Sequence, residues 1–277
     1  MPASLLPDPI LPDRLNAPFP KLNTHVTGDG HPLVLLHGGH GSWTHWIRNI
    51  DALARHFRVI AFDLPGYGAS PDVAKDIAVD DYIAWVADAV AGIAAQHSGD
   101  GIEHGIDLAG FSFGGALSAR IAPRLGRSLR RLSLLGPSGF GARAVTELDR
   151  LPPPGDERRV AIAAANLGAF MLARSAAPDD PVVAIQLANI DGTRFDSRRV
   201  SRRSTMLEDL PRIPAPVQMI WGAHDKLPLP SLQARVEECR RVRPDVQVTV
   251  VPDGGHWIQY DQPDAVNRLL IDFHRRA

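Results

Sequence analysis

The chain has 277 residues, 44% of them hydrophobic, which is enough for one large α/β domain or two small ones with a sizeable core. Lys and Arg total 30 against 31 Asp and Glu, so charge gives no case for a nucleic-acid partner. A single cysteine, Cys239, excludes an internal disulfide and a thiolate metal cluster. The helical pattern around Cys239 indicates a small, half-buried hydrophobic residue.

The first 20 residues contain six prolines and lack the basic segment and apolar core of a secretory signal. We therefore expect an irregular leader that lies along the surface. No apolar run approaches the roughly 18 residues of a membrane span. The expectation is a cytoplasmic protein that has no membrane partner. The sequence predicts no oligomeric state.

Short runs rich in β-branched residues or leucine are typical of buried parallel strands. They cover residues 33–36, 59–62, 106–109, 132–135, 217–221 and 246–251. Helical patterns lie between the early runs, at 43–56 and 80–96. This alternation predicts a doubly wound, mostly parallel α/β sheet.

The alternation stops between residues 136 and 216. This stretch contains helical patterns and the break LPPPG (151–155), but no convincing strand. We predict a core made of residues 1–136 and 213–277, with an all-helical insertion of residues 137–212 that is about the size of a lid.

The hexapeptide GFSFGG (110–115) lies where a strand run gives way to a helical pattern. Ser112 is its only hydroxyl, and Gly110 and Gly114 fit G-x-S-x-G. A serine at such a sharp turn is held in a strained conformation that lifts its hydroxyl above the sheet edge. The start of the following helix favours developing negative charge. Ser112 is therefore the predicted nucleophile.

The loop HGGHGSW (37–43) follows the first strand run. An acyl-transfer enzyme needs backbone N–H groups aimed at the oxyanion of its tetrahedral intermediate. A glycine turn here provides one, most plausibly from Gly39, and the second would come from Phe113, the residue after the nucleophile.

The same loop has a metal-site interpretation. His37, His40 and His45 are possible ligands, but no carboxylate accompanies them nearby, so zinc is disfavoured.

The loop also imitates a dinucleotide fingerprint, because Gly39 and Gly41 follow a strand and Asp63 ends the next one. The third glycine is missing, since Thr44 stands in its place, and a dehydrogenase is disfavoured for that reason.

Two later strand ends carry an acid and a base. WGAHD (221–225) ends the first strand after the insertion, and its Asp225 is placed to orient an imidazole and stabilise the imidazolium. DGGHW (253–257) follows the run 246–251, and His256 would reach the serine if these two strands are neighbours. Five other histidines are expected to be solvated, in loops or on polar helix faces: His31, His56, His97, His104 and His274.

The order of Ser112, Asp225 and His256 along the chain is the α/β-hydrolase order of nucleophile, acid and base. HGG, DLPGYGAS (63–70), GFSFGG, WGAHD and GGHW also occur in that family's order. From residue 22 onward the chain resembles the α/β-hydrolase fold family, in its serine-nucleophile branch. The resemblance implies that DLPGYGAS shapes the site entrance and that the insertion is a helical cap over the pocket.

Within this family the residue at the strand-to-helix turn separates the reactions. Relatives that cleave carbon–halogen bonds or open epoxides carry aspartate there, so Ser112 implies acyl transfer on esters, lactones, thioesters or activated ketones. His256 would take the serine proton, and water would later release the acyl group. No cofactor or metal is expected. The residues expected around the pocket are Gly38, Phe111, Phe113 and Trp257, with part of 140–170.

Two features resemble the meta-cleavage-product hydrolases, which split a carbon–carbon bond in ring-fission products. Trp257 follows the histidine directly, and the segment 192–204 holds five arginines against one aspartate; those enzymes bind a substrate carboxylate with a cap arginine. Two positions depart from that pattern: Phe111 replaces a usual asparagine, and His-Gly-Ser replaces Gly-Pro-Gly. The arginines are Arg194, Arg198, Arg199, Arg202 and Arg203.

The spacing of four between Arg198 and Arg202, and between Arg199 and Arg203, is also typical of a solvated helix face. A carboxylic ester hydrolase is therefore the first prediction, and a carbon–carbon bond hydrolase is the alternative. A small-molecule receptor on the same fold stays open, because fold does not fix function. A cyanohydrin lyase is a remoter option.

Overall fold

The computed structural model describes residues 19–97, 105–141 and 148–276. Most of the proline-rich leader and His104 lie outside the described residues. Seven strands form one sheet in the order β1-β3-β2-β4-β5-β6-β7, in which β1 runs antiparallel to β3 and the other neighbouring pairs are parallel. The strands are β1 (Thr24–Thr27), β2 (Pro32–Leu36), β3 (Arg58–Phe62), β4 (Ile106–Phe111), β5 (Leu129–Leu135), β6 (Val217–Gly222) and β7 (Gln247–Val251).

All the predicted strands are present, and the doubly wound, mostly parallel fold is confirmed. β2 and β4 are buried along their whole length, which is why they appear in the sequence as continuous apolar runs. β1 was not predicted. Its sequence, THVT, contains no such run, because it is an edge strand whose residues are exposed or half-buried.

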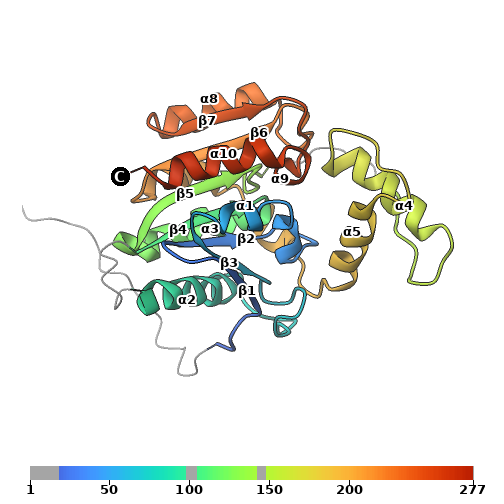
Figure 1. The fold of residues 1–277 in the computed structure, drawn as a ribbon, viewed down its shortest axis with the longest axis horizontal. Coiled ribbons are helices and arrows are strands. Elements are labelled where there is room, and N and C mark those ends of the chain that lie inside the picture. The colour runs from blue at the N-terminus through green and yellow to red at the C-terminus, as the bar shows by residue number, and fades with distance from the viewer. Residues whose placement is uncertain (1–18, 98–104, 142–147, 277) are drawn as a thin grey trace, which may run out of the picture.

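Helices cover both faces of the sheet (Figure 1). The hydrophobic residues of α2, α3 and α8 pack on one face, and those of α1 and α10 on the other. These helices are α1 (Ile50–Leu53), α2 (Val79–His97), α3 (Phe113–Leu125), α8 (Leu232–Val242) and α10 (Pro263–His274). None of the helices in the described part of the chain is long and apolar enough to cross a lipid bilayer.

The helix predicted over 43–56 is wrong in extent. A 3₁₀ turn, η1 (Trp43–Trp46), is separated from α1 by a short break. Asn49 lies at this break and is fully buried; its side-chain amide donates to the Gln259 carbonyl (3.1 Å) and the Asn267 side chain (2.9 Å). These bonds join the break to the C-terminal part of the chain.

Cys239 in α8 is fully buried in the hydrophobic core, more deeply than expected. Burial raises the pKa of its thiol to about 12, so it behaves as a small hydrophobic side chain.

We call residues 137–212 the insertion; they follow β5 and precede β6. Apart from one isolated bridge between Phe140 and Ser204, its described residues form helices and turns. α4 and α5 lie beyond the carboxyl ends of the parallel strands (Figure 1). The elements are α4 (Arg159–Asn166), the π-turn η3 (Leu167–Met171), α5 (Pro181–Asp191), α6 (Arg198–Ser201), α7 (Met206–Asp209) and η4 (Leu210–Arg212).

The arginine-rich part of the insertion does not form the one helix face that the spacing suggested, although Arg198, Arg202 and Arg203 are exposed, as that interpretation expected. α6 is a single turn that ends at Ser201. Arg194 pairs with Asp72, and Arg199 donates to the Ile77 carbonyl. These two arginines tie the insertion to the core.

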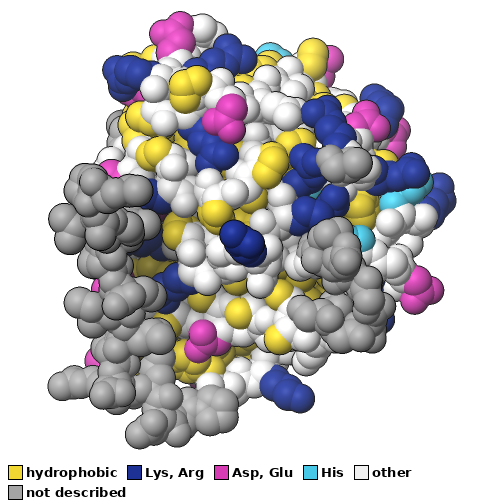
Figure 2. All heavy atoms as spheres, turned by 90° about the vertical axis from the view of Figure 1, so that its left-hand side faces the viewer, with side chains coloured by type: hydrophobic (Ala, Val, Ile, Leu, Met, Phe, Trp, Pro, Cys, Tyr) yellow, Lys and Arg dark blue, Asp and Glu magenta, His cyan; other side chains and the backbone are white. Residues whose placement is uncertain are grey.

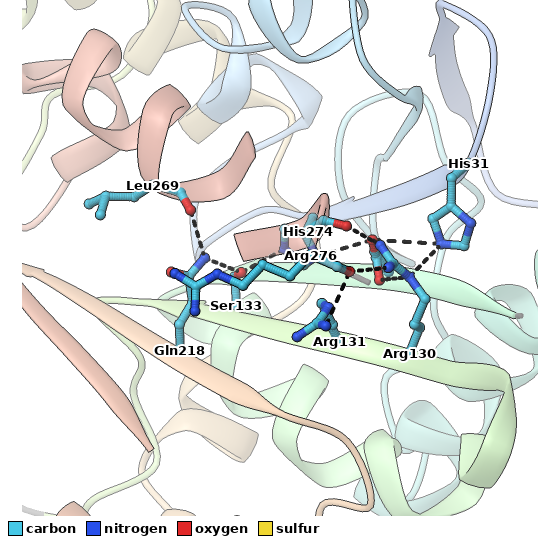
Figure 3. A network of polar contacts seen from close by, with 9 residues as sticks. His31, Arg130, Arg131, Ser133, Gln218, Leu269, His274 and Arg276 are labelled. Carbon is cyan, nitrogen blue, oxygen red and sulfur yellow. Dashed lines mark hydrogen bonds and ion pairs between the residues drawn. The ribbon is translucent and has the colours of Figure 1, made fainter. Parts of the chain in front are cut away.

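A buried polar network lies at the opposite end of the sheet, where the parallel strands begin (Figure 3). The fully buried Asp107 carboxylate accepts two hydrogen bonds from Arg130, at 3.1 and 2.5 Å. His274 is fully buried as well: its Nδ1 lies 3.2 Å from Asp107 and its Nε2 lies 2.7 Å from the Ser133 hydroxyl. Gln218 donates to the same hydroxyl (2.7 Å). The expectation that His274 is solvated is wrong, because α10 ends against the sheet.

The surface at this end carries groups of Lys and Arg side chains (Figure 2). Arg130 and Arg131 both donate to the Arg276 carbonyl, at 3.1 and 3.2 Å, and so hold the C-terminal segment. His31 was also expected to be solvated, but it is half-buried, with Nε2 3.6 Å from the Asp107 carboxylate.

Candidate active site

Ser112 lies at the sharp turn between β4 and α3, with φ 50° and ψ −109°, a strained combination for a side chain with a Cβ. The glycines on either side of Ser112 are required because neighbouring backbone atoms leave no room for a Cβ. A Cβ on Gly110 would lie 2.4 Å from the Gly114 carbonyl oxygen, and one on Gly114 would lie 2.5 Å from the carbonyl oxygens of Leu36 and His37. The glycines therefore let α3 begin directly against β2 and β4.

Ser112, His256 and Asp225 form one hydrogen-bonded chain. The Ser112 hydroxyl lies 2.9 Å from His256 Nε2, and His256 Nδ1 lies 3.0 Å from Asp225 Oδ2. The side chains of His256 and Asp225 are 2% and 1% exposed, so bulk water does not compete for these bonds. The other Asp225 oxygen accepts the Leu227 N–H (3.0 Å), which fixes the carboxylate. Three residues from distant parts of the sequence are thus brought together.

The imidazole of His256 packs near two phenylalanines. The Phe111 ring lies 5.0 Å from it, and the Phe170 ring of the insertion lies 5.7 Å from it, centroid to centroid. The imidazole therefore has an apolar neighbour from the core and another from the insertion.

The loop with Gly39 is anchored by a buried, neutral histidine. His37 Nε2 accepts the Leu64 N–H (2.9 Å), so the ring proton is on Nδ1, which donates to the Gly38 carbonyl (2.7 Å). Burial lowers the pKa of His37 to about 4. Neither Gly39 nor Phe113 uses its backbone N–H to bond another described residue, and both residues line the same cavity as Ser112.

His45 anchors the same loop from the other side. Its Nδ1 accepts the Gly38 N–H (3.1 Å), and burial lowers its pKa well below the ordinary value. Both ring nitrogens of His37 and the Nδ1 of His45 are thus already in use and are not free to bind a metal. Among the described residues, no group of three His, Cys, Asp or Glu side chains is arranged to hold a metal ion.

Ser112 and His256 open on a cavity of about 420 Å³ between the core and the insertion. The insertion contributes Phe140, Phe170, Met171, Ser197, Arg198, Ser201 and Arg202 to its walls. The core contributes Gly39, Phe111, Ser112, Phe113, Trp221, Asp225, Arg235 and His256.

Gly38 and Trp257 were expected at the pocket, but neither lines this cavity. The Gly38 N–H is turned away, toward His45. Trp257 is fully buried behind the site, where its indole N–H donates to the His45 carbonyl (2.9 Å) and its ring packs on the His45 ring at 4.6 Å. Both residues therefore support the loop that carries Gly39.

Three arginines line the cavity: Arg198, Arg202 and Arg235. Arg235 in α8 is 5% exposed; its guanidinium lies 4.2 Å above the Phe140 ring and is paired with Glu238 (2.5 Å). Arg198 is paired with Asp196 (2.6 Å).

Sequence reasoning did not find Arg235 or Ser197 as cavity residues. Arg235 lies in a pattern that is typical of a surface helix, and Ser197 lies in no motif. The structure puts the Ser197 hydroxyl where a Cβ on Gly39 would come within 2.5 Å of it. A glycine at position 39 is therefore also what allows the insertion to approach the loop.

The chain was compared with known proteins. Residues 33–269 match the alpha/beta hydrolase family. It is 29% identical over 270 residues to the "dihydrolipoyllysine-residue acetyltransferase component of acetoin cleaving system" of Pseudomonas putida, with 89% of this chain covered but only 64% of that protein. It is 28% identical to the "2-hydroxy-6-oxo-2,4-heptadienoate hydrolase" of Pseudomonas putida, with 91% of this chain and 92% of that protein covered.

Among solved structures, a thermophilic esterase from Thermogutta terrifontis superposes with a TM-score of 0.65 at 22% identity, covering 92% of this chain and 93% of that one. At this identity the likeness shows the fold. The family match, however, covers most of the chain. The protein belongs to the alpha/beta hydrolase family and is a hydrolase.

Proposed function

We propose that the protein is a serine hydrolase in which Ser112 is the nucleophile, His256 the general base and Asp225 the acid that orients it. One observation carries this proposal: the hydrogen-bonded chain of these three residues ends in a hydroxyl that opens on a cavity. A serine that is packed away from every cavity would have no access to substrate.

The reaction follows from the geometry. His256 Nε2 takes the Ser112 proton as the serine oxygen bonds to the substrate carbonyl carbon, and the carbonyl oxygen becomes an oxyanion between the N–H groups of Gly39 and Phe113. Collapse of this intermediate breaks the bond to the leaving group, which takes the proton from His256. Water then repeats the steps on the acyl-enzyme, releases the acid and restores Ser112.

We further propose that the insertion acts as a cap over this site, so that the chain divides into a core of residues 1–136 and 213–277 and a cap of residues 137–212. The support is that side chains of the insertion form part of the cavity wall around Ser112. A cap that excludes water strengthens the electrostatic interactions inside the site.

A carboxylic ester or activated ketone of small size is the substrate class we favour. The cavity has aromatic walls from Phe113, Phe140 and Phe170. Arg235 and Arg198 are already paired with carboxylates of the chain, so these cations need no anionic substrate for compensation.

A carbon–carbon bond hydrolase is the second candidate. Arg198, Arg202 and Arg235 line the cavity that contains Ser112, and a carboxylated dienol would need such a cation. One of the two Pseudomonas putida relatives, the "2-hydroxy-6-oxo-2,4-heptadienoate hydrolase", is named for a substrate of this kind.

Two measurements test the proposal. A fluorophosphonate should label the wild-type protein and should not label Ser112→Ala; equal labelling of both would overturn the assignment of the nucleophile. Turnover of 4-nitrophenyl acetate should exceed turnover of a ring-fission dienoate. Turnover of neither compound, with tight binding of a small molecule, would instead support a receptor.

The arginines separate the two hydrolase candidates. Arg202→Gln should leave ester turnover close to that of Arg203→Gln, the matched control, because Arg203 is exposed and does not line the cavity. A large loss of dienoate turnover in Arg202→Gln alone, with a clear preference of the wild type for the dienoate, would reverse the order of the two candidates.

A further inference from the structure

The π-turn η3 and the two residues that follow it contact His256 and its chain neighbours. Isolated π-turns are uncommon and are frequently found at functional sites. Phe170 of this turn packs against the His256 ring and lines the cavity. Two loops of the core bind the turn: the loop that carries His256 and the loop that carries Asp225.

Asp261, the last residue of α9 (Ile258–Asp261), joins the His256 loop to the insertion. Its Oδ2 accepts the Gly255 N–H (2.8 Å) and also the Ala173 N–H (2.8 Å). On the other side of His256, the Trp257 N–H donates to the Met171 carbonyl (2.7 Å). The residues before and after His256 are therefore both joined to the segment 171–173, Gly255 through the Asp261 carboxylate and Trp257 directly.

Gly255 permits this close contact. A Cβ at this position would lie 2.5 Å from the Leu172 carbonyl carbon and 2.6 Å from the Ala173 nitrogen. The backbone of the insertion thus rests directly on the residue that precedes His256, and Asp261 closes the contact from the side.

Lys226 makes the corresponding contact beside Asp225. Its Nζ donates to the carbonyls of Gly168 (3.2 Å) and Ala169 (2.8 Å) in η3. Carbonyls at the end of a helical turn lack intrahelical partners, so a lysine satisfies them at little cost.

We propose that Asp261 is a positioning residue for His256: its carboxylate fixes the histidine loop and the insertion in one geometry, so that Nε2 faces Ser112 while Phe170 covers the imidazole. This inference rests on the proposed role of His256 as the general base. Asp261 touches no reacting atom. It acts through the Gly255 peptide, and a displacement of about 1 Å at a general base is enough to cost about a hundredfold in rate.

The test compares Asp261→Ala with Asp261→Asn and with Asp272→Ala. Asn keeps an acceptor oxygen at the same place and should restore function. Asp272 is an exposed carboxylate on α10, so its removal controls for loss of a charge from this part of the chain. On 4-nitrophenyl acetate we expect Asp261→Ala to lower kcat roughly ten- to a hundredfold, with KM changed less than about threefold. Asp261→Asn should stay within about threefold of wild type.

Hydrogen exchange supplies a readout that does not depend on turnover. The N–H groups of Gly255 and Ala173 should exchange faster in Asp261→Ala than in Asp272→Ala. If Asp261→Ala does not fold, Asp261→Thr replaces it, because the shorter hydroxyl cannot accept both bonds.

Two results would overturn the positioning role. One is a kcat of Asp261→Ala within twofold of that of Asp272→Ala; the other is an equal loss in Asp261→Asn and Asp261→Ala. A wild type that a fluorophosphonate does not label would overturn the proposed function and this role with it. A labelled wild type with an unimpaired Asp261→Ala would overturn the positioning role alone.

Discussion

Two Ser–His–Asp arrangements lie in the described part of the chain, one at each end of the sheet. At the carboxyl ends of the strands, His256 lies 2.9 Å from Ser112 and 3.0 Å from Asp225. Where the parallel strands begin, His274 lies 2.7 Å from Ser133 and 3.2 Å from Asp107 (Figure 3). Both histidines are buried, and the donor and acceptor atoms correspond.

The surroundings of the two serines differ. Ser112 opens on the cavity that Gly39 and Phe113 also line. Ser133 is fully buried, and its oxygen already accepts from Gln218. Because the Asp107 carboxylate can only accept, the neutral His274 ring carries its proton on Nδ1, toward Asp107, and its Nε2 accepts the Ser133 hydroxyl proton.

The charge balance differs as well. The Asp107 carboxylate is already neutralised by Arg130, which donates to both of its oxygens. Residue types and distances alone therefore do not make an active site. The end with Ser112 differs in two ways: its serine opens on a cavity, and two residues that line this cavity, Gly39 and Phe113, have backbone N–H groups without a partner among the described residues. These features decide which of the two hydrogen-bonded Ser–His–Asp sets we expect to react.

The largest effect expected from this comparison is on the nucleophile. Ser112→Ala should lower turnover of 4-nitrophenyl acetate by roughly four orders of magnitude or more, because no other described hydroxyl faces both His256 and the cavity. Ser133→Ala should keep turnover and fluorophosphonate labelling at the wild-type level in the folded protein. Loss of labelling in Ser133→Ala, with retention in Ser112→Ala, would exchange the roles of the two ends.

The next effect concerns the two acids. Asp225→Asn should lower kcat by roughly two to four orders of magnitude, since the amide disturbs the tautomer and orientation of His256 rather than the packing. Asp107→Asn should leave kcat within about threefold of wild type, because it lies at the other end of the sheet. Kinetics and thermal unfolding measured on both variants would test this division; equal losses of kcat would contradict it.

The sequence was sufficient to bring Ser112, His256 and Asp225 together because each of these three residues lies in a local motif. Glycines flank Ser112 and precede His256, and close approach requires them: a Cβ on Gly255 would meet the backbone at 172–173. Such requirements leave a pattern within a few residues of the site. The strands were predictable for a similar reason, since a strand buried on both faces is a continuous apolar run.

The other end left no such pattern. Asp107, Ser133, Gln218 and His274 come from β4, β5, β6 and α10, and only the sheet order brings them together. A histidine near the end of a chain looks solvated from its neighbours in sequence. Trp257 was misplaced for the same reason: its position after His256 suggested the pocket, whereas the backbone turns its side chain back toward His45.

A smaller effect is expected on stability, and here the order of the two ends reverses. Asp107→Ala should lower the free energy of unfolding by roughly 2–4 kcal/mol, because it leaves Arg130 and His274 without their carboxylate partner in a largely buried site. Asp225→Asn keeps the shape and one acceptor, and should cost less. Urea unfolding of both variants measures the difference; a larger loss in Asp225→Asn would contradict it.

The smallest effect is on the pH dependence of stability. Burial lowers the pKa of His274, against the opposing effect of Asp107 and with a contribution from Arg130 and Arg131. The folded state then binds fewer protons than the unfolded chain, whose histidines have a pKa near 6.5. The contribution of His274 to the free energy of unfolding is therefore fully present above about pH 6.5 and is lost as the pH falls below that value. For one proton the loss is no more than about 1.4 kcal/mol per pH unit.

The pKa of the Asp107 carboxyl is lowered too: burial alone would raise it, but hydrogen bonds from His274, His31 and Arg130 outweigh burial. That carboxyl adds a loss only below its ordinary value of 3.8, so the fall between pH 7 and 5 is expected from His274 rather than from Asp107. We expect His274→Gln, which keeps an acceptor for the Ser133 hydroxyl, to flatten the fall in unfolding free energy between pH 7 and 5. His56→Gln, at an exposed position, is the matched control. Urea titrations at the two pH values measure the slopes, and a slope in His274→Gln as steep as in wild type would show that this imidazole can accept its proton without leaving the fold.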